Sequence, residues 1–155
     1  MHILKIATLL LGGLFLYSCS PQGAVTPEMA HIMLRDAYRN SDSEMFTAQL
    51  SRKSIEKIQF ILANIKKTDR AQCENIASKI GTDCDTLKIL TPVSYVSLQL
   101  SLDRKPGNNS FKNFLQSDIT GKKSFPQKCT LVTANGMEIN FVKEGPYWKL
   151  DFRDF

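Results

Sequence analysis

The sequence predicts an α+β fold in which short amino-terminal helices pack on a curved antiparallel β-sheet. Three observations lead to this prediction. Apolar residues recur at helical spacing between residues 26 and 80, and an alternation of apolar and polar residues replaces that spacing after Gly81. Asn135 and Gly136 then form the dipeptide typical of a tight hairpin turn. Helices followed by hairpin-connected strands are the order expected when helices cover one face of a sheet.

The first expected helix begins where the hydroxyl of Thr26 can cap it, Pro27 takes its first position and Glu28 adds an acid to its first turn. It ends near residues 39–42. Its buried face is predicted from helical spacing, and the residues on that face are Met29, Ala30, Ile32, Met33, Leu34 and Ala37.

Three further helices are expected. Asp42 or Ser43 caps a short one, Ser51 caps the next, and Asp69 caps the last, which ends at Gly81. The longest of the three carries an apolar stripe, formed by Ile55, Ile58, Ile61, Leu62 and Ile65.

Four strands are expected after these helices, at residues 96–102, 129–134, 138–142 and 148–152, because apolar and polar residues alternate there. The alternation is clearest in the first, where Val96, Leu98, Leu100 and Leu102 are separated by polar residues. Between the first two strands, the spacing at residues 110–115 is compatible with a short helix. The whole segment 110–127 is expected to pack as a loop against the domain rather than to form a mobile lid.

Composition limits the classes of protein. The chain has 155 residues, of which 43% are apolar and 23% charged, so it fits one globular domain and excludes wholesale disorder. The net charge of +5 is mild, and the basic residues are dispersed without interleaved aromatics. We therefore expect no nucleic-acid partner. No metal and no cofactor are expected, because the cysteine spacing matches no zinc pattern and His31 is the one histidine beyond the amino-terminal segment.

The amino terminus resembles the signal of bacterial lipoproteins. Lys5 precedes an almost wholly apolar run at residues 6–16, which is shorter than the roughly 20 residues that span a bilayer. Leu16-Tyr17-Ser18-Cys19 then resembles the lipobox. The resemblance implies cleavage before Cys19 and lipid attachment to that cysteine. It divides the chain into a signal peptide (1–18), a lipidated tether (19–25) and an α+β domain (26–155).

The same resemblance predicts where the protein is located. Ser20, rather than aspartate, follows the lipidated cysteine, which in the Gram-negative sorting pattern favours the outer membrane. The lipid on Cys19 is then the contact with the membrane, and the domain faces the periplasm of the bacterial cell envelope. A protein partner in the envelope is a further expectation, and the identity of a small-molecule ligand stays open.

The last expected hairpin points to a family. Its residues Glu144-Gly145-Pro146-Tyr147-Trp148-Lys149-Leu150-Asp151 follow a run of short helices and a curved sheet, and residues 37–43 lead to Phe46 in a helix and turn. This order is similar to the nuclear transport factor two-like, cystatin-like superfamily, especially its small bacterial lipoproteins. The resemblance covers residues 26–152. It implies a cone-shaped sheet around a cavity, in which isomerases and dehydratases of the superfamily place a carboxylate base and Tyr or His donors.

The expected domain contains three cysteines. Cys73 and Cys84 flank the reversal at Gly81, and an exported protein can form disulfides. A bridge between them is predicted, which requires their Cα atoms to lie within about 7 Å. Cys129 shares strand parity with Leu131 and is expected to be a small buried apolar residue.

No catalytic residue is predicted, although one alternative stays open. Asp36 lies at the edge of the predicted apolar face of the first helix, where burial would raise the pKa of a carboxyl group and suit it to act as a base. Tyr38 is the donor that would accompany it. The favoured interpretation is that Asp36 is a boundary residue, that His31 is exposed, and that Tyr38, Tyr95 and Tyr147 contribute packing.

The function that the sequence favours is a lipid-anchored envelope protein that binds a ligand or a protein without catalysis. One alternative is a small enzyme of isomerase or dehydratase type that uses Asp36 and Tyr38. Another is an accessory subunit of an envelope secretion assembly. A polar pocket containing Asp36 would favour the enzyme, whereas an exposed Asp36 would argue against it.

Overall fold

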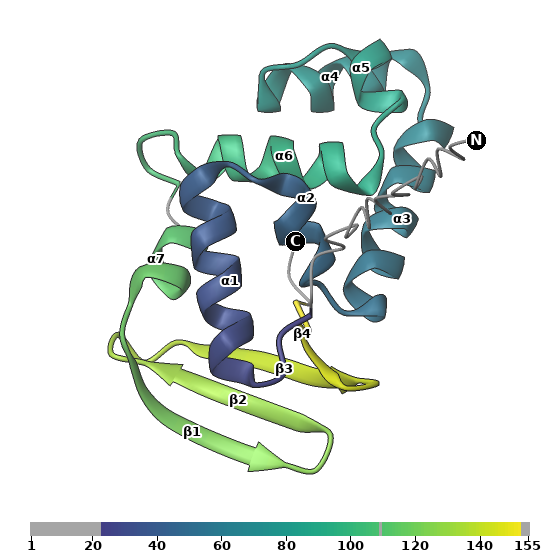
Figure 1. Cartoon of the computed structure of the whole chain (residues 1–155). Coiled ribbons are helices and arrows are strands. Elements are labelled where there is room, and N and C mark those ends of the chain that lie inside the picture. The colour runs from purple at the N-terminus through teal and green to yellow at the C-terminus, as the bar shows by residue number, and fades with distance from the viewer. Residues whose placement is uncertain (1–22, 109, 153–155) are drawn as a thin grey trace, which may run out of the picture.

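The computed structural model describes residues 23–108 and 110–152, which form seven helices and a four-stranded antiparallel sheet (Figure 1). The predicted lipidation site Cys19 lies outside the described residues. The helices are α1 (Pro27–Asn40), α2 (Ser43–Ala48), α3 (Arg52–Lys67), α4 (Arg70–Ile80), α5 (Cys84–Lys88), α6 (Pro92–Asp103) and α7 (Ser110–Gln116). The strands are β1 (Ile119–Phe125), β2 (Lys128–Thr133), β3 (Glu138–Glu144) and β4 (Tyr147–Leu150), and they pair in chain order. The prediction of an α+β fold is confirmed.

Side-chain caps fix where the helices begin. The hydroxyl of Thr26 accepts a hydrogen bond from the backbone N–H of Met29 at 3.1 Å, and five further helices start at a capping side chain in the same way. These five caps are Asp42, Ser51, Asp69, Asp83 and Thr91. The helix starts predicted at residues 26, 42, 51 and 69 are therefore confirmed. Gly81 ends α4 in the left-handed conformation, with φ of 74°.

The core lies between the helices and one face of the sheet. Figure 1 shows α1 and α7 on the same side of the sheet. Strand pairing aligns the residues that face them: Cys129 is opposite Phe141, and Leu131 is opposite Ile139. Phe141 is in turn opposite Leu150. All five of these side chains are buried, so each strand from β2 to β4 contributes alternate residues to one core.

The outer edge of β4 is covered by two backbone contacts. Near its start, the N–H of Trp148 donates to the carbonyl of Ala24 at 2.7 Å, and Ala24 is fully buried. At its end, the N–H of Leu150 donates to the backbone carbonyl of Gln49, and the N–H of Ser51 donates to the backbone carbonyl of Leu150, both at 2.8 Å. Ala24 is therefore part of the folded domain, although the sequence assigns it to the tether. A covered edge also removes a site at which strands of other chains could pair.

The strand predicted at residues 96–102 is wrong, because this segment belongs to helix α6. Pro92 takes the first helical position, and Thr91 and Ser94 form a reciprocal capping box. The helix packs against α2, α3 and α7, so it needs apolar residues on several sides. Its leucines then alternate with serine and glutamine by coincidence, and that alternation imitates a half-buried strand.

The segment 110–127 is also more ordered than the predicted loop. Helix α7 agrees with the helical spacing of Phe111, Phe114 and Leu115, all of which are buried. Residues 119–125 form the edge strand β1, with an irregular register between Ile119 and Gly121. This strand is largely exposed on both faces, so its sequence lacks the alternation that identifies a strand.

The disulfide pair lies in a separate small cluster. Cys73 and Cys84 are joined by a disulfide with their Cα atoms 5.4 Å apart. With Ala77 and Leu87 they form the buried centre of α4 and α5, which lie on the far side of α6 from the sheet (Figure 1).

Cys129 is a buried free thiol in the main core, as expected from its strand position. Within the described residues, no helix is long and apolar enough to cross a membrane.

Candidate functional site

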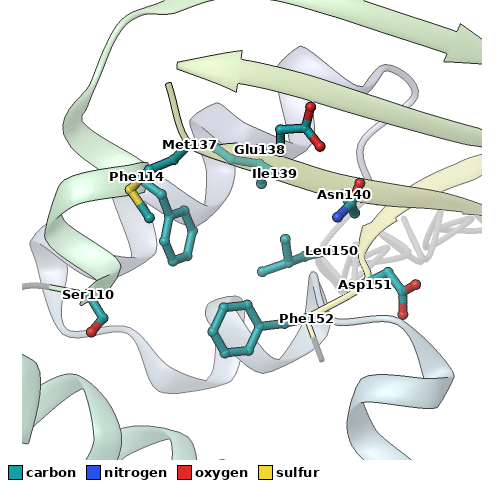
Figure 2. Close-up of a pocket in the computed structure, with 9 residues that line it drawn as sticks. All are labelled: Ser110, Phe114, Met137, Glu138, Ile139, Asn140, Leu150, Asp151 and Phe152. Atoms are coloured by element: carbon teal, nitrogen blue, oxygen red, sulfur yellow. The ribbon is translucent and has the colours of Figure 1, made fainter. Parts of the chain in front are cut away.

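A pocket of about 400 Å³ lies between α7 and the last two strands (Figure 2). Figure 2 shows Phe114, Leu150 and Phe152 turned toward one another in this pocket. Ile139 completes an apolar floor, and the half-exposed Met137 lies at its rim. The pocket therefore presents a mixed surface, with somewhat more apolar than polar area, to a ligand.

Polar side chains lie around this apolar floor. The carboxylates of Glu138 and Asp151 point away from the aromatic rings in Figure 2. Glu138 accepts an ion-pair hydrogen bond from Lys123 at 2.6 Å on the open face of the sheet. Ser110 contributes an exposed hydroxyl to the lining. A bound molecule would thus meet an apolar interior with hydrogen-bonding groups near the mouth.

Aromatic packing positions the two rings that line the pocket. The Phe152 ring is stacked on the Phe114 ring with centroids 5.9 Å apart, and it lies 5.4 Å from the Phe111 ring. Phe111 also contacts Phe46 edge to face, with centroids 5.5 Å apart. Such offset and edge-to-face pairs stabilise aromatic clusters beyond the area that they bury. The wall of the pocket is therefore continuous with the core.

Buried hydroxyl groups fix the end of β4 beside the pocket. The Ser54 hydroxyl donates to the carbonyl of Leu150 at 3.1 Å and accepts from the N–H of Phe152 at 2.9 Å. Ser51, which caps α3, donates to a carboxylate oxygen of Asp151 at 3.4 Å. Ser51, Ser54 and Asp151 are all buried. These polar groups attach α3 to the strand that carries the pocket floor.

Tyr38 belongs to a second polar group, centred on Asp103. The Tyr38 hydroxyl donates to Oδ2 of Asp103 at 2.9 Å, and both side chains are buried. The carboxylate also accepts the backbone N–H groups of Phe111 and Lys112, at 2.9 and 3.1 Å. Burial, together with the hydrogen bond to Asp103, raises the pKa of the Tyr38 phenol. Tyr38 and Asp103 thus connect α1, α6 and the first turn of α7.

The structure does not bring together the alternative catalytic pair of Asp36 and Tyr38. Asp36 is exposed, whereas Tyr38, two positions later on the same helix, is buried. Residues two apart on a helix point in different directions, so the two side chains do not face one site. Asp36 is also not among the residues that line the pocket in Figure 2.

The prediction that His31 is exposed is wrong. His31 is 3% exposed, and its Nε2 donates to the carbonyl of Phe114 at 3.2 Å. Burial lowers the pKa of His31, and the hydrogen bond to Phe114 opposes that shift. The core face of α1 is rotated relative to the prediction, since Met29 and Ile32 are 44% and 46% exposed. Residues on the observed core face are Ala30, His31, Leu34, Ala37 and Tyr38.

The other two tyrosines of the described residues, Tyr95 and Tyr147, lie in structural rather than functional surroundings. Burial raises the pKa of Tyr95 in α6. Tyr147 is half-buried, and the Nζ atom of Lys149 lies 5.9 Å from the centroid of its ring. Within the described residues, no group of three His, Cys, Asp or Glu side chains could hold a metal ion.

Neither Asp103 nor the pocket is predicted from the sequence. Asp103 directly follows the segment 96–102 that the sequence predicts as a strand, so its position at a helix end was hidden. The pocket is formed by residues from α7, β3 and the chain after β4, which only the folded topology brings together. The close spacing of Phe111 and Phe114 was the one local signal of this aromatic wall.

Comparisons with known proteins found no matching family model, no matching curated protein and no matching solved structure. The function of the site is therefore inferred from its own residues.

Proposed function

We propose that this chain is a lipid-anchored protein of the bacterial cell envelope that binds a small apolar ligand in the pocket between α7 and the sheet. The observation that carries the binding role is the apolar floor formed by Phe114, Ile139, Leu150 and Phe152. The pocket's volume of about 400 Å³ falls within the range of about 300–1,000 Å³ that is typical of small-molecule sites.

The chemistry of the lining supports a particular class of ligand. Met137 at the rim and the aromatic rings inside favour an apolar body, because its transfer from water is driven by burial of hydrocarbon surface. The exposed hydroxyl of Ser110 can hydrogen-bond one polar group near the mouth. A small molecule with an apolar body and a single polar end therefore fits this lining best.

The anchor in this proposal rests on the lipobox-like residues Leu16-Tyr17-Ser18-Cys19. Ala24 is held at the edge of β4, only five positions after Cys19. At about 3.6 Å for each extended residue, the tether spans at most roughly 20 Å. A lipid on Cys19 would therefore keep the domain close to the membrane surface.

Binding rather than catalysis is supported by the partners of the polar groups. Asp103 accepts three hydrogen bonds that connect helices, and Ser54 holds the end of β4. Asp36, the proposed base of the alternative enzyme, is exposed away from the pocket. An envelope secretion partner stays a prediction of the sequence, and affinity capture after cross-linking in intact cells would test it.

The binding role is tested by filling the pocket from its rim. N-phenyl-1-naphthylamine, an apolar dye that fluoresces in apolar surroundings, is titrated into the protein. Met137→Trp should weaken dye binding at least about tenfold, because the indole occupies space that the dye needs. Ile89→Trp is the matched control, since Ile89 is 77% exposed and lies outside the pocket. Equal affinities in the two variants would contradict the proposed site.

The anchor is tested separately by metabolic labelling with palmitate. Wild-type protein should incorporate label and fractionate with outer membranes, and Cys19→Ala should lose both properties. Label that persists in Cys19→Ala would reject the anchor while leaving the pocket proposal intact.

A further inference from the structure

A second pocket, of about 310 Å³, lies at the junction of α1, α6 and α7, and half of its lining residues are cationic. Arg39 comes from the last turn of α1, Arg104 follows α6, and Lys112 comes from α7. Gln116, one turn after Lys112, adds an amide to the lining. The end of α1 and the consecutive, distant elements α6 and α7 thus bring three positive charges to one cavity.

The carboxylate in this pocket, that of Asp103, already accepts hydrogen bonds from the protein itself. Asp103 lines the cavity and is buried, and it accepts hydrogen bonds from Tyr38, from the N–H of Phe111 and from the N–H of Lys112. Three of the roughly four acceptor sites of this carboxylate are therefore taken by the protein's own donors. Within the described residues, no carboxylate forms an ion pair with Arg39, Arg104 or Lys112.

Arg104 is held in place before any ligand arrives. Its two terminal nitrogens donate to the hydroxyl of Ser41 and to the carbonyl of Tyr38. Its guanidinium carbon also lies 5.3 Å from the centroid of the Tyr38 ring. These contacts fix the guanidinium at the wall of the cavity, so little side-chain entropy is lost when an anion binds nearby. Arg39 and Lys112 are exposed and can turn toward the same anion.

We infer that the pocket lined by Arg39, Arg104 and Lys112 binds a small anionic group of the phosphate or carboxylate type. Charge-assisted hydrogen bonds from arginine and lysine to such oxygens are short and strong, and a fixed guanidinium suits their planar or tetrahedral faces. The source of the group is either a free small molecule or the headgroup of an anionic phospholipid. This site is distinct from the apolar pocket and does not depend on the function proposed for it.

Nuclear magnetic resonance can test this site with inorganic phosphate as the probe. The full chain, labelled with ¹⁵N and kept in non-ionic detergent, is titrated at constant ionic strength. The amide signals of Lys112 and Gln116 and the side-chain signals of Arg39 and Arg104 should shift with a saturable dependence on phosphate. The double variant Arg39→Gln/Lys112→Gln should bind phosphate at least about tenfold more weakly, because two charge-assisted contacts are lost.

Lys53→Gln is the matched control, because Lys53 is an exposed lysine on α3 that is remote in sequence from the pocket and does not line it. This variant should titrate like wild type. Shifts that do not saturate, or that are the same in the double variant, would overturn the site and indicate adventitious ion binding only. A parallel titration with short-chain phosphatidylglycerol identifies the source. Tighter binding of this lipid than of phosphate supports a headgroup site, and tighter binding of phosphate supports a free anion.

Discussion

The hydroxyl of Tyr38 on α1 donates to Oδ2 of Asp103, the last residue of α6, across 2.9 Å and 65 positions of sequence. The same carboxylate accepts the N–H groups of Phe111 and Lys112 in the first turn of α7. One buried side chain therefore sets the relative positions of three helices. Because Phe114 lies on α7, the wall of the apolar pocket also depends on this contact.

Tyr38→Phe tests how much this contact contributes to the free energy of unfolding. The substitution keeps the ring and removes only the hydroxyl, so Asp103 loses one of its three donors inside the protein. Hydrogen bonds to charged groups contribute about 1.5–3 kcal/mol, so the free energy of unfolding should fall by about that amount. Urea unfolding followed through Trp148, the single tryptophan of the chain, gives this value.

Tyr147→Phe provides the matched control. Tyr147 is half-buried, and its contact with Lys149 involves the ring rather than the hydroxyl. The free energy of unfolding should then change by less than about 0.5 kcal/mol. If Tyr38→Phe and Tyr147→Phe were equally stable, the Tyr38–Asp103 contact would carry no net stabilisation.

The pH dependence of stability should report on His31. Burial lowers the pKa of His31 in the folded state below the usual value of 6.5. In the range between these two pKa values, the unfolded chain binds more protons than the folded one. The stability contributed by neutral His31 is therefore complete above pH 6.5 and is lost as the pH falls toward the lower, folded-state pKa. Urea unfolding at a series of pH values from 8 to 5 should show this decline.

His31→Gln separates the histidine from other titrating groups. The glutamine amide can still donate to the carbonyl of Phe114, but it does not titrate. The slope of stability against pH between 8 and 5.5 should therefore flatten in this variant, even if its absolute stability is lower. An unchanged slope would show that His31 is not the group responsible.

The sequence predicts the helix starts and the final hairpins well because both depend on local chemistry. Caps such as Thr26 and Ser51, and the left-handed turn at Gly136, are determined by a few neighbouring residues. The same local patterns predict the wrong element where packing against residues distant in sequence decides the structure. Helix α6 lies among three other helices, so burial on several sides removes the helical periodicity from its sequence.

The candidate site was harder to predict than the fold. On α1, the small residues Ala30 and Ala37 are buried together with His31, whereas the larger Ile32 is exposed. Helical spacing assigns the larger apolar residues to the core, and it does not take into account that small residues allow close packing. Asp103 could not be recognised as a connecting group either, since its donors come from residues 38, 111 and 112.

The disulfide between Cys73 and Cys84 should stabilise α4 and α5 locally. Their buried cluster is small, and it lies apart from the main core. Closing a loop of this length in the unfolded chain contributes about 3 kcal/mol in the chain-entropy model. The double variant Cys73→Ala/Cys84→Ala should therefore lose hydrogen-exchange protection at residues 70–88, while the amides of β2 and β3 keep theirs.

Reduction provides the control for this prediction. Dithiothreitol should reproduce the exchange pattern of the double variant in wild-type protein and should leave the variant itself unchanged, because Cys129 is a free thiol. In the Cys19→Ser chain, thiol titration in denaturant should find only Cys129 before reduction. A uniform loss of protection across helices and strands would mean that α4 and α5 unfold together with the sheet. The disulfide would then stabilise the whole domain rather than one part of it.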